Sequence, residues 1–107
     1  MNILNTLIKA QNKINKPSKW ISYWCISDDG KRYGVDGALW WAILGFSELT
    51  PLRATKKQQK LYNDCMDILA NQTNINSMWK AEDRVCYPGK HWEVMEMFDK
   101  AITSLSL

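Results

Sequence analysis

The sequence predicts a mostly α (α+β) domain with four helices and one small β-hairpin. One of the four helices is apolar and central, and the others pack around it. The first observation is the run 37–46, the most apolar in the chain, which follows Asp36, a favourable helix N-cap. The second is a set of three other segments whose apolar residues recur at helical spacing. The third is Asp29-Gly30, a strong hairpin signal, between two β-prone runs.

Length and composition indicate one ordinary globular domain. The chain has 107 residues, of which 46% are hydrophobic and 23% charged. Its longest apolar run is far short of the roughly 20 residues that a membrane span requires. The N-terminus lacks the basic and long apolar regions of a signal peptide, so we expect a cytoplasmic protein that does not bind membranes.

The first predicted helix covers residues 2–15 and has one apolar face. Lysines lie largely on its opposite side, and Pro17 ends it because proline disfavours the α conformation of the preceding residue. The apolar arc consists of Ile3, Leu4, Leu7, Ile8 and Ile14.

The predicted hairpin has Asp29-Gly30 at its tip, in a type I′ turn. This register pairs Ile26 with Tyr33 and Trp24 with Val35. A lone two-stranded hairpin is marginal in water, so we expect these side chains to cover the apolar helix that follows.

That helix is apolar nearly all round, which is typical of a buried helix. Its small residues Ala38, Ala42 and Gly45 lie on one side, where other helices can come close. Trp40 and Trp41 lie on the other side, together with Leu44. A short hairpin hides about one large ring, so we expect one tryptophan to be buried. The other is expected at the edge of an exposed apolar patch with Trp20 or Tyr23.

Two more helices complete the fold. Thr55 and Gln58 form a capping-box pattern that opens a helix to about residue 70, and residues 71–76 are predicted to form a loop. The last helix covers about residues 90–104, with His91 on its apolar arc.

The order of these pieces resembles a family of small bacterial and phage-associated helical domains known as a domain of unknown function. The matching parts are Leu7-Ile8, 20–30, 35–45, Met78-Trp79, and Glu93-Val94 to Ala101-Ile102. The chain departs from the family pattern at Lys80-Ala81 and at Lys90. The resemblance implies the fold order and a phage or mobile-element accessory protein, such as an inhibitor of a host complex, but no activity.

Reactive side chains are few, which favours a protein without metal, cofactor or catalysis. Cys25, Cys65 and Cys86 are odd in number and widely spaced, so we expect buried free thiols. His91 is the only histidine, and no metal-ligand spacing occurs. A weaker enzyme hypothesis would use Glu48 or His91, or a Cys86/His91 pair.

We therefore predict a non-catalytic module that binds another protein through a tryptophan-rich patch, with homodimerisation left open. The predicted patch consists of Trp20, Tyr23, Trp40, Trp41 and Leu44. The alternative is a nucleic-acid-binding protein that uses lysine clusters, which a net charge of +3 makes less favoured. Its lysines are Lys9, Lys13, Lys16, Lys19, Lys56 and Lys57.

Overall fold

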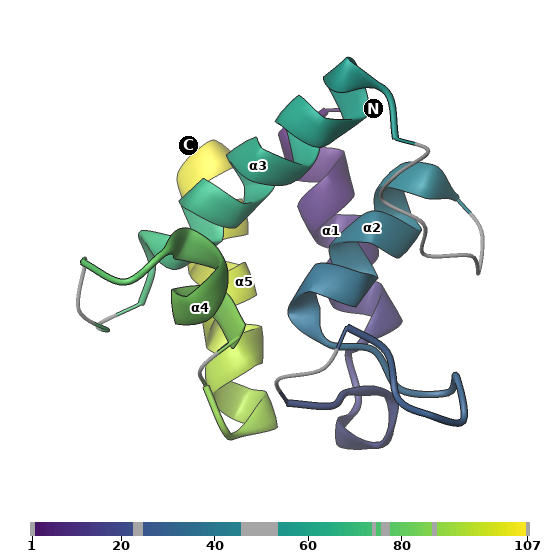
Figure 1. Ribbon diagram of the computed structural model, residues 1–107. Coiled ribbons are helices and arrows are strands. Elements are labelled where there is room, and N and C mark those ends of the chain that lie inside the picture. Colours follow the sequence, from purple (N-terminus) through teal and green to yellow (C-terminus); the bar gives the residue numbers. More distant parts are fainter. Residues whose placement is uncertain are drawn as a thin grey trace.

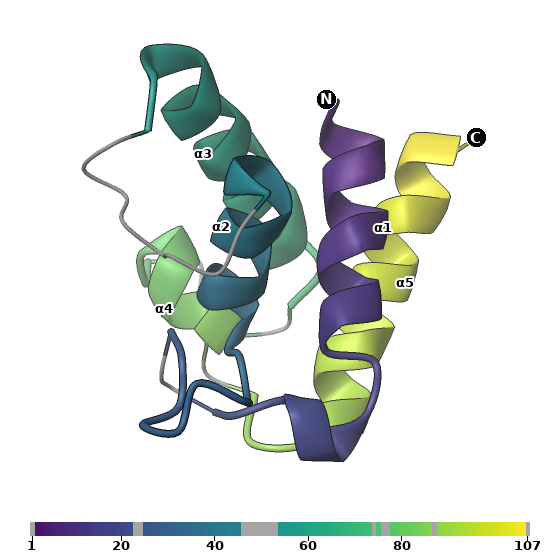
Figure 2. The same cartoon turned by 90° about the vertical axis from the view of Figure 1, so that its right-hand side faces the viewer.

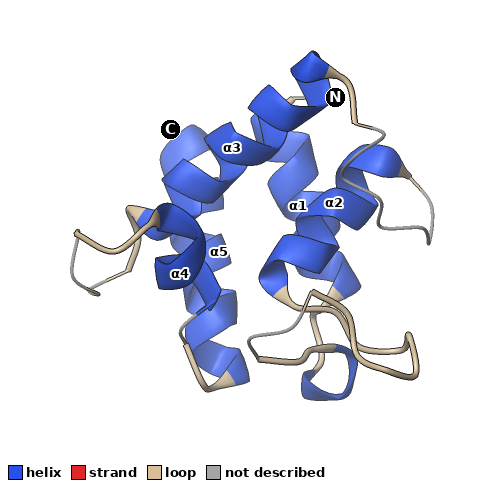
Figure 3. Ribbon diagram, viewed as in Figure 1, coloured by secondary structure: helices blue, strands red, loops and turns tan. Residues whose placement is uncertain are grey.

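The computed structural model describes residues 2–22, 25–45, 54–73, 75, 78–86 and 88–106. Within these ranges the chain forms five α-helices and one short 3₁₀ helix, and no strand (Figure 3). The elements are α1 (Ile3–Lys13), η1 (Pro17–Lys19), α2 (Val35–Leu44), α3 (Lys56–Ala70), α4 (Ala81–Cys86) and α5 (His91–Ser106). None of these helices is long and apolar enough to cross a membrane.

The helices form two layers. Helices α1 and α5 run antiparallel in one layer, with both chain ends at the same edge of the domain (Figures 1 and 2). Helices α2, α3 and α4 form the other layer (Figure 2). Helix α2, predicted to be central, packs on α1, α3 and α4, whereas α3 packs on all four other helices.

The core comes from every α-helix. Its fully buried side chains include a phenylalanine, three leucines and small residues that let the helices approach closely. They are Leu7, Ala10, Ala38, Leu39, Ala42, Cys65, Leu69, Val85, Phe98 and Ala101. Of the three small residues predicted to face other helices, Ala38 and Ala42 are buried, whereas Gly45 is exposed.

Side-chain caps open two of the helices. The side chain of Asn2 accepts a hydrogen bond of 2.8 Å from the N–H of Asn5 and opens α1. The predicted capping box of α3 is confirmed, since Thr55 and Gln58 exchange side-chain hydrogen bonds with each other's backbone N–H groups.

The predicted β-hairpin is wrong. Ile26 and Tyr33 form an isolated antiparallel bridge, and Tyr33 also forms a parallel bridge with Trp20, but no ladder extends from them in the described residues. Val35, predicted to be a strand residue, is the first residue of α2. Trp24, its predicted partner, lies outside the described residues. The chain does turn here, with Gly30 at φ +71°, but the N–H of Gly30 donates to the Ser27 carbonyl, so the turn is centred on residues 28–29 and not on 29–30.

The start of α2 also differs from the prediction. Gly34, not Asp36, is the N-cap, and Asp36 lies in the first turn. Gly37 faces the chain at Cys25 so closely that a Cβ there would overlap the Cys25 carbonyl oxygen. Helix α2 ends at Gly45, whose φ of +76° is a left-handed C-cap conformation that glycine adopts freely.

Helix α4 was not predicted. Its six residues pack mainly on α3, and Val85 is its buried anchor. Glu82 and Asp83 lie in its first turn.

Candidate functional site: the lysine groove

The two neighbouring tryptophans of α2 have different surroundings, as predicted. Trp40 is 7% exposed and stacks on Tyr62 of α3, with ring centroids 4.2 Å apart and planes 11° apart. Trp41 is half-buried and faces α1. The prediction that one of the two rings is buried is therefore confirmed.

The other described residues of the predicted tryptophan-rich patch have surroundings of their own. Trp20 is half-buried and meets His91 edge to face, with ring centroids 5.8 Å apart. Leu44 packs against the hydrophobic core, and Tyr23 lies outside the described residues. The role of this set in partner binding stays a prediction.

Lysines of α1 cover the ring of Trp41. The Nζ atoms of Lys9 and Lys13 lie 5.3 and 4.4 Å from the centroid of that ring. Lys13 is also 4.8 Å from the ring centroid of Tyr33. These are cation–π distances, so the aromatic rings attract the two ammonium groups and restrict where they lie.

Two further lysines and an asparagine complete a groove on this side of the molecule. We call it the lysine groove; it is lined by Lys9, Asn12, Lys13, Lys19, Lys31 and Trp41 and has a volume of about 320 Å³. Its lining contains four ammonium groups and no carboxylate, and the ion pairs of the described residues lie elsewhere. A ligand in the groove therefore meets a positive field, which the Asp29 carboxylate weakens on the side of Lys31.

The backbone holds Lys19 and Lys31 beside α1. The carbonyl oxygen of Lys19 accepts a hydrogen bond of 2.9 Å from the N–H of Tyr33, which joins η1 to the segment before α2. The N–H of Lys31 donates to Asp29 Oδ1 over 3.0 Å. The predicted lysine cluster is thus assembled in part, since Lys9, Lys13 and Lys19 line the groove, whereas Lys16, Lys56 and Lys57 do not.

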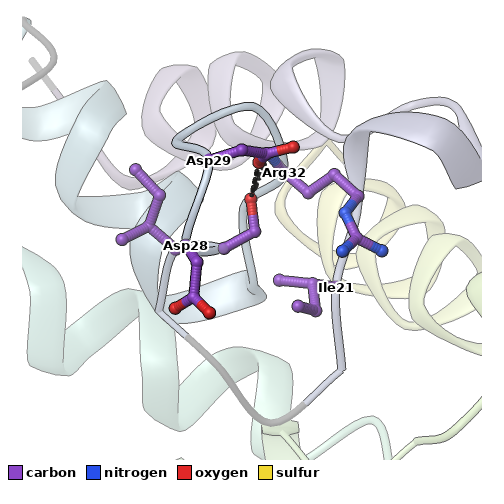
Figure 4. Close-up of a pocket in the computed structure, with 6 residues that line it drawn as sticks. Ile21, Asp28, Asp29 and Arg32 are labelled. Carbon is purple, nitrogen blue, oxygen red and sulfur yellow. Dashed lines mark hydrogen bonds between the residues drawn. The ribbon is translucent and has the colours of Figure 1, made fainter.

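Figure 4 shows the neighbouring hollow at the turn that carries Lys31. The Ser27 hydroxyl donates to Asp29 Oδ1 over 2.5 Å and accepts from the N–H of Arg32 over 3.0 Å. The Ser27 hydroxyl and the N–H of Lys31 lower the pKa of Asp29. Because its carboxylate is bound within the turn, Asp29 acts as a structural brace and is not poised as a general base.

The thiols are unsuited to nucleophilic chemistry. All three cysteines are free, and burial raises each pKa to about 12. At Cys25 and Cys86 the nearby carboxyl groups of Asp36 and Glu82 contribute to this rise in pKa. The thiols therefore stay protonated at neutral pH. In the part of the chain that the structure describes, no group of three or more metal-ligating side chains gathers.

The residues of the enzyme hypothesis give it little support. His91 is half-buried, and its Nε2 atom lies 2.7 Å from the carbonyl oxygen of Ile14, where it joins α5 to the end of α1. The bond makes His91 a structural contact between two helices. Glu48 lies outside the described residues.

The chain has no match among known protein families, curated proteins or solved structures. The resemblance drawn from the sequence therefore stays a prediction. Sequence reasoning missed Lys31 and Asn12 as lining residues of the groove. For Lys31, its place directly after the Asp29-Gly30 turn was the available signal.

Proposed function

We propose that the protein is a non-catalytic binding protein whose lysine groove binds the phosphate backbone of nucleic acid. The observation that supports this proposal is the convergence of four lysines from three chain segments around Trp41, with no carboxylate in the lining. Phosphate contacts supply much of the affinity of nucleic-acid-binding proteins.

The arrangement on α1 points to a ligand because it works against the helix. Lys9 and Lys13 are four residues apart, and like charges at this spacing destabilise a helix by about 0.2–0.5 kcal/mol. The Trp41 ring attracts both ammonium groups and offsets part of this repulsion. A polyanion that lies across the groove would remove the rest.

The lining chemistry also favours nucleic acid over an acidic protein. Lysine binds phosphate as a point charge, and Asn12 adds amide groups that can contact phosphate, sugar or base edges. Two lysines cover the Trp41 ring, so the groove offers a nucleic acid mainly phosphate contacts, which carry no sequence information directly. We therefore expect binding with little sequence preference.

The protein-binding prediction has weaker support at the predicted residues. The Trp40 ring lies in the core, and two lysines cover the Trp41 ring, so these two side chains do not form one exposed apolar patch. For this reason we rank nucleic-acid binding by the lysine groove first. A role as an accessory protein that inhibits a host complex stays a prediction from the resemblance.

The test is fluorescence anisotropy with a labelled single-stranded 20-mer. The binding constant is measured at salt concentrations between about 50 and 200 mM. Contacts from four lysines predict a slope of log K against log salt of about −3 for a single strand. Replacing Lys9, Lys13 and Lys31 with glutamine is expected to reduce this slope to about −1 and to weaken binding at low salt.

The matched control is Lys56→Gln with Lys57→Gln, two lysines that open α3 outside the groove. This variant is expected to keep most of the affinity. An equal loss in both variants would show a general charge effect and overturn the assignment to the groove. If the unaltered protein does not bind at about 50 mM salt, the low end of the range, the proposal of nucleic-acid binding is overturned.

A further inference from the structure

Trp92 in the first turn of α5 is unusually exposed. Its side chain is 61% exposed, while the next turn of the same helix buries Val94 and Met97. Folding gains little from an indole left in water. Exposed tryptophans beside a groove are common anchors of protein–protein contacts.

The ring borders a second groove, distinct from the lysine groove. We call it the Trp92 groove; Ile75, Pro88, Trp92 and Met97 supply apolar lining, and Glu93, Glu96 and Lys100 supply charge. The volume is about 290 Å³, at the small end of ligand sites, which accommodates one long side chain together with part of its own chain.

The free charge in this groove is negative. Lys100 Nζ lies 2.8 Å from Glu96 Oε1, so these two charges neutralise each other. The side chain of Gln72 donates to the Ile68 carbonyl and that of Thr73 to the Ala70 carbonyl, which ties the opposite wall to the end of α3. Glu93 is left as the carboxylate that can pair with a ligand.

We propose that the Trp92 groove docks an extended peptide segment of a partner protein through an arginine side chain. A guanidinium group stacks on an indole face and pairs with a carboxylate at the same time, and its apolar stem fits the Pro88 and Met97 surface. The charge of the groove selects this occupant, because an acidic segment would be repelled by Glu93.

The test is a ¹⁵N–¹H correlation titration of the full chain with the peptide acetyl-Ala-Leu-Arg-Leu-Ala-amide. Saturable shifts at the Trp92 indole N–H and the neighbouring α5 amides are expected. The same peptide with citrulline in place of arginine keeps the shape and removes the charge, and it is expected to bind about tenfold more weakly. Equal binding of both peptides would overturn the recognition of arginine.

Two substitutions on the exposed surface of α5 have opposite expected effects. Glu93→Gln removes the free carboxylate and is expected to weaken binding about tenfold. Lys100→Gln releases Glu96 from its ion pair and is expected to tighten binding. The reverse order would overturn the charge argument.

Trp92→Ala is expected to abolish the peptide-induced shifts of the neighbouring α5 amides. The far-UV circular dichroism spectrum is expected to stay unchanged, because the Trp92 ring is mostly in solvent. Concentration-dependent association of the protein alone that Trp92→Ala removes would instead identify a second copy as the occupant and overturn the proposal. None of these readouts depends on nucleic acid, so the two proposals fail independently.

Discussion

Replacement of Trp40 by alanine is expected to lower the free energy of unfolding by about 3–5 kcal/mol, the usual cost of removing a buried aromatic side chain. Trp40 is 7% exposed, so nearly its whole ring returns to water on unfolding. The stack on Tyr62 at 4.2 Å adds about 0.5–1.5 kcal/mol beyond burial. Since domains of this size are stable by about 5–15 kcal/mol, the loss is a large part of the total.

Trp41→Ala is the matched control, one position along the same helix. Its half-buried ring contacts Lys9 and Lys13, and an exposed cation–π pair contributes about 0.5–1 kcal/mol. We therefore expect a cost of about 1–2 kcal/mol, which is well below that of Trp40→Ala.

Urea unfolding followed by far-UV circular dichroism measures both variants, with an unchanged dependence on denaturant as the sign of two-state unfolding. If Trp40→Ala does not fold, Trp40→Phe and Trp41→Phe provide the same comparison. A phenylalanine substitution is expected to lower the free energy of unfolding by about 0.5–3 kcal/mol. An equal or larger loss at Trp41 would refute the assignment of Trp40 to the core.

Two further predictions concern the start of α2. Burial raises the pKa of Asp36, against the N–H groups of Gly37 and Asp36 that lower it, and one of its oxygens, Oδ1, is buried without a hydrogen bond in the structure described. The stability linked to this group is complete below the unfolded pKa and is lost as pH rises through the folded pKa. Asp36→Asn is therefore expected to raise the melting temperature at pH 7, with a gain that shrinks as the pH falls and is lost by about pH 4. A gain of zero at pH 7 would show that the carboxyl is solvated. Gly37→Ala is expected to lower the free energy of unfolding by about 1–3 kcal/mol, because its Cβ would overlap the Cys25 carbonyl. Its control is Gly89→Ala, where a Cβ meets open space and thermal unfolding is expected to change little. Equal melting temperatures of the two variants would contradict the close packing at Gly37.

The parts of the fold that could be predicted are those decided by neighbours in sequence. The capping box at Thr55 and Gln58 needs only two residues three positions apart, and both of its hydrogen bonds form. The turn at Gly30 likewise needs only a residue that accepts positive φ.

The errors occur where distant packing competes with local preference. A hairpin needs a ladder on both sides of its turn, but the chain pairs Tyr33 with both Ile26 and Trp20, and α2 begins two residues later. Val35 favours strands by propensity, yet it is 2% exposed at the head of α2, where burial outweighs propensity. Helix α4 is too short for its apolar period to be read from the sequence.

The lysine groove shows why a binding surface is harder to predict than a helix. The spacing of Lys9 and Lys13 on one face of α1 can be read from the sequence. Adjacent side chains on a helix point about 100° apart, so either Trp40 or Trp41 could have faced these lysines. The packing of Ala38 and Ala42 in the core turns Trp40 toward Tyr62 of α3 and leaves Trp41 beside α1. Lys31 joins them from the turn in which its N–H donates to Asp29. The lysines of the groove can thus be identified from the sequence, while their convergence on the Trp41 ring depends on how three segments pack together.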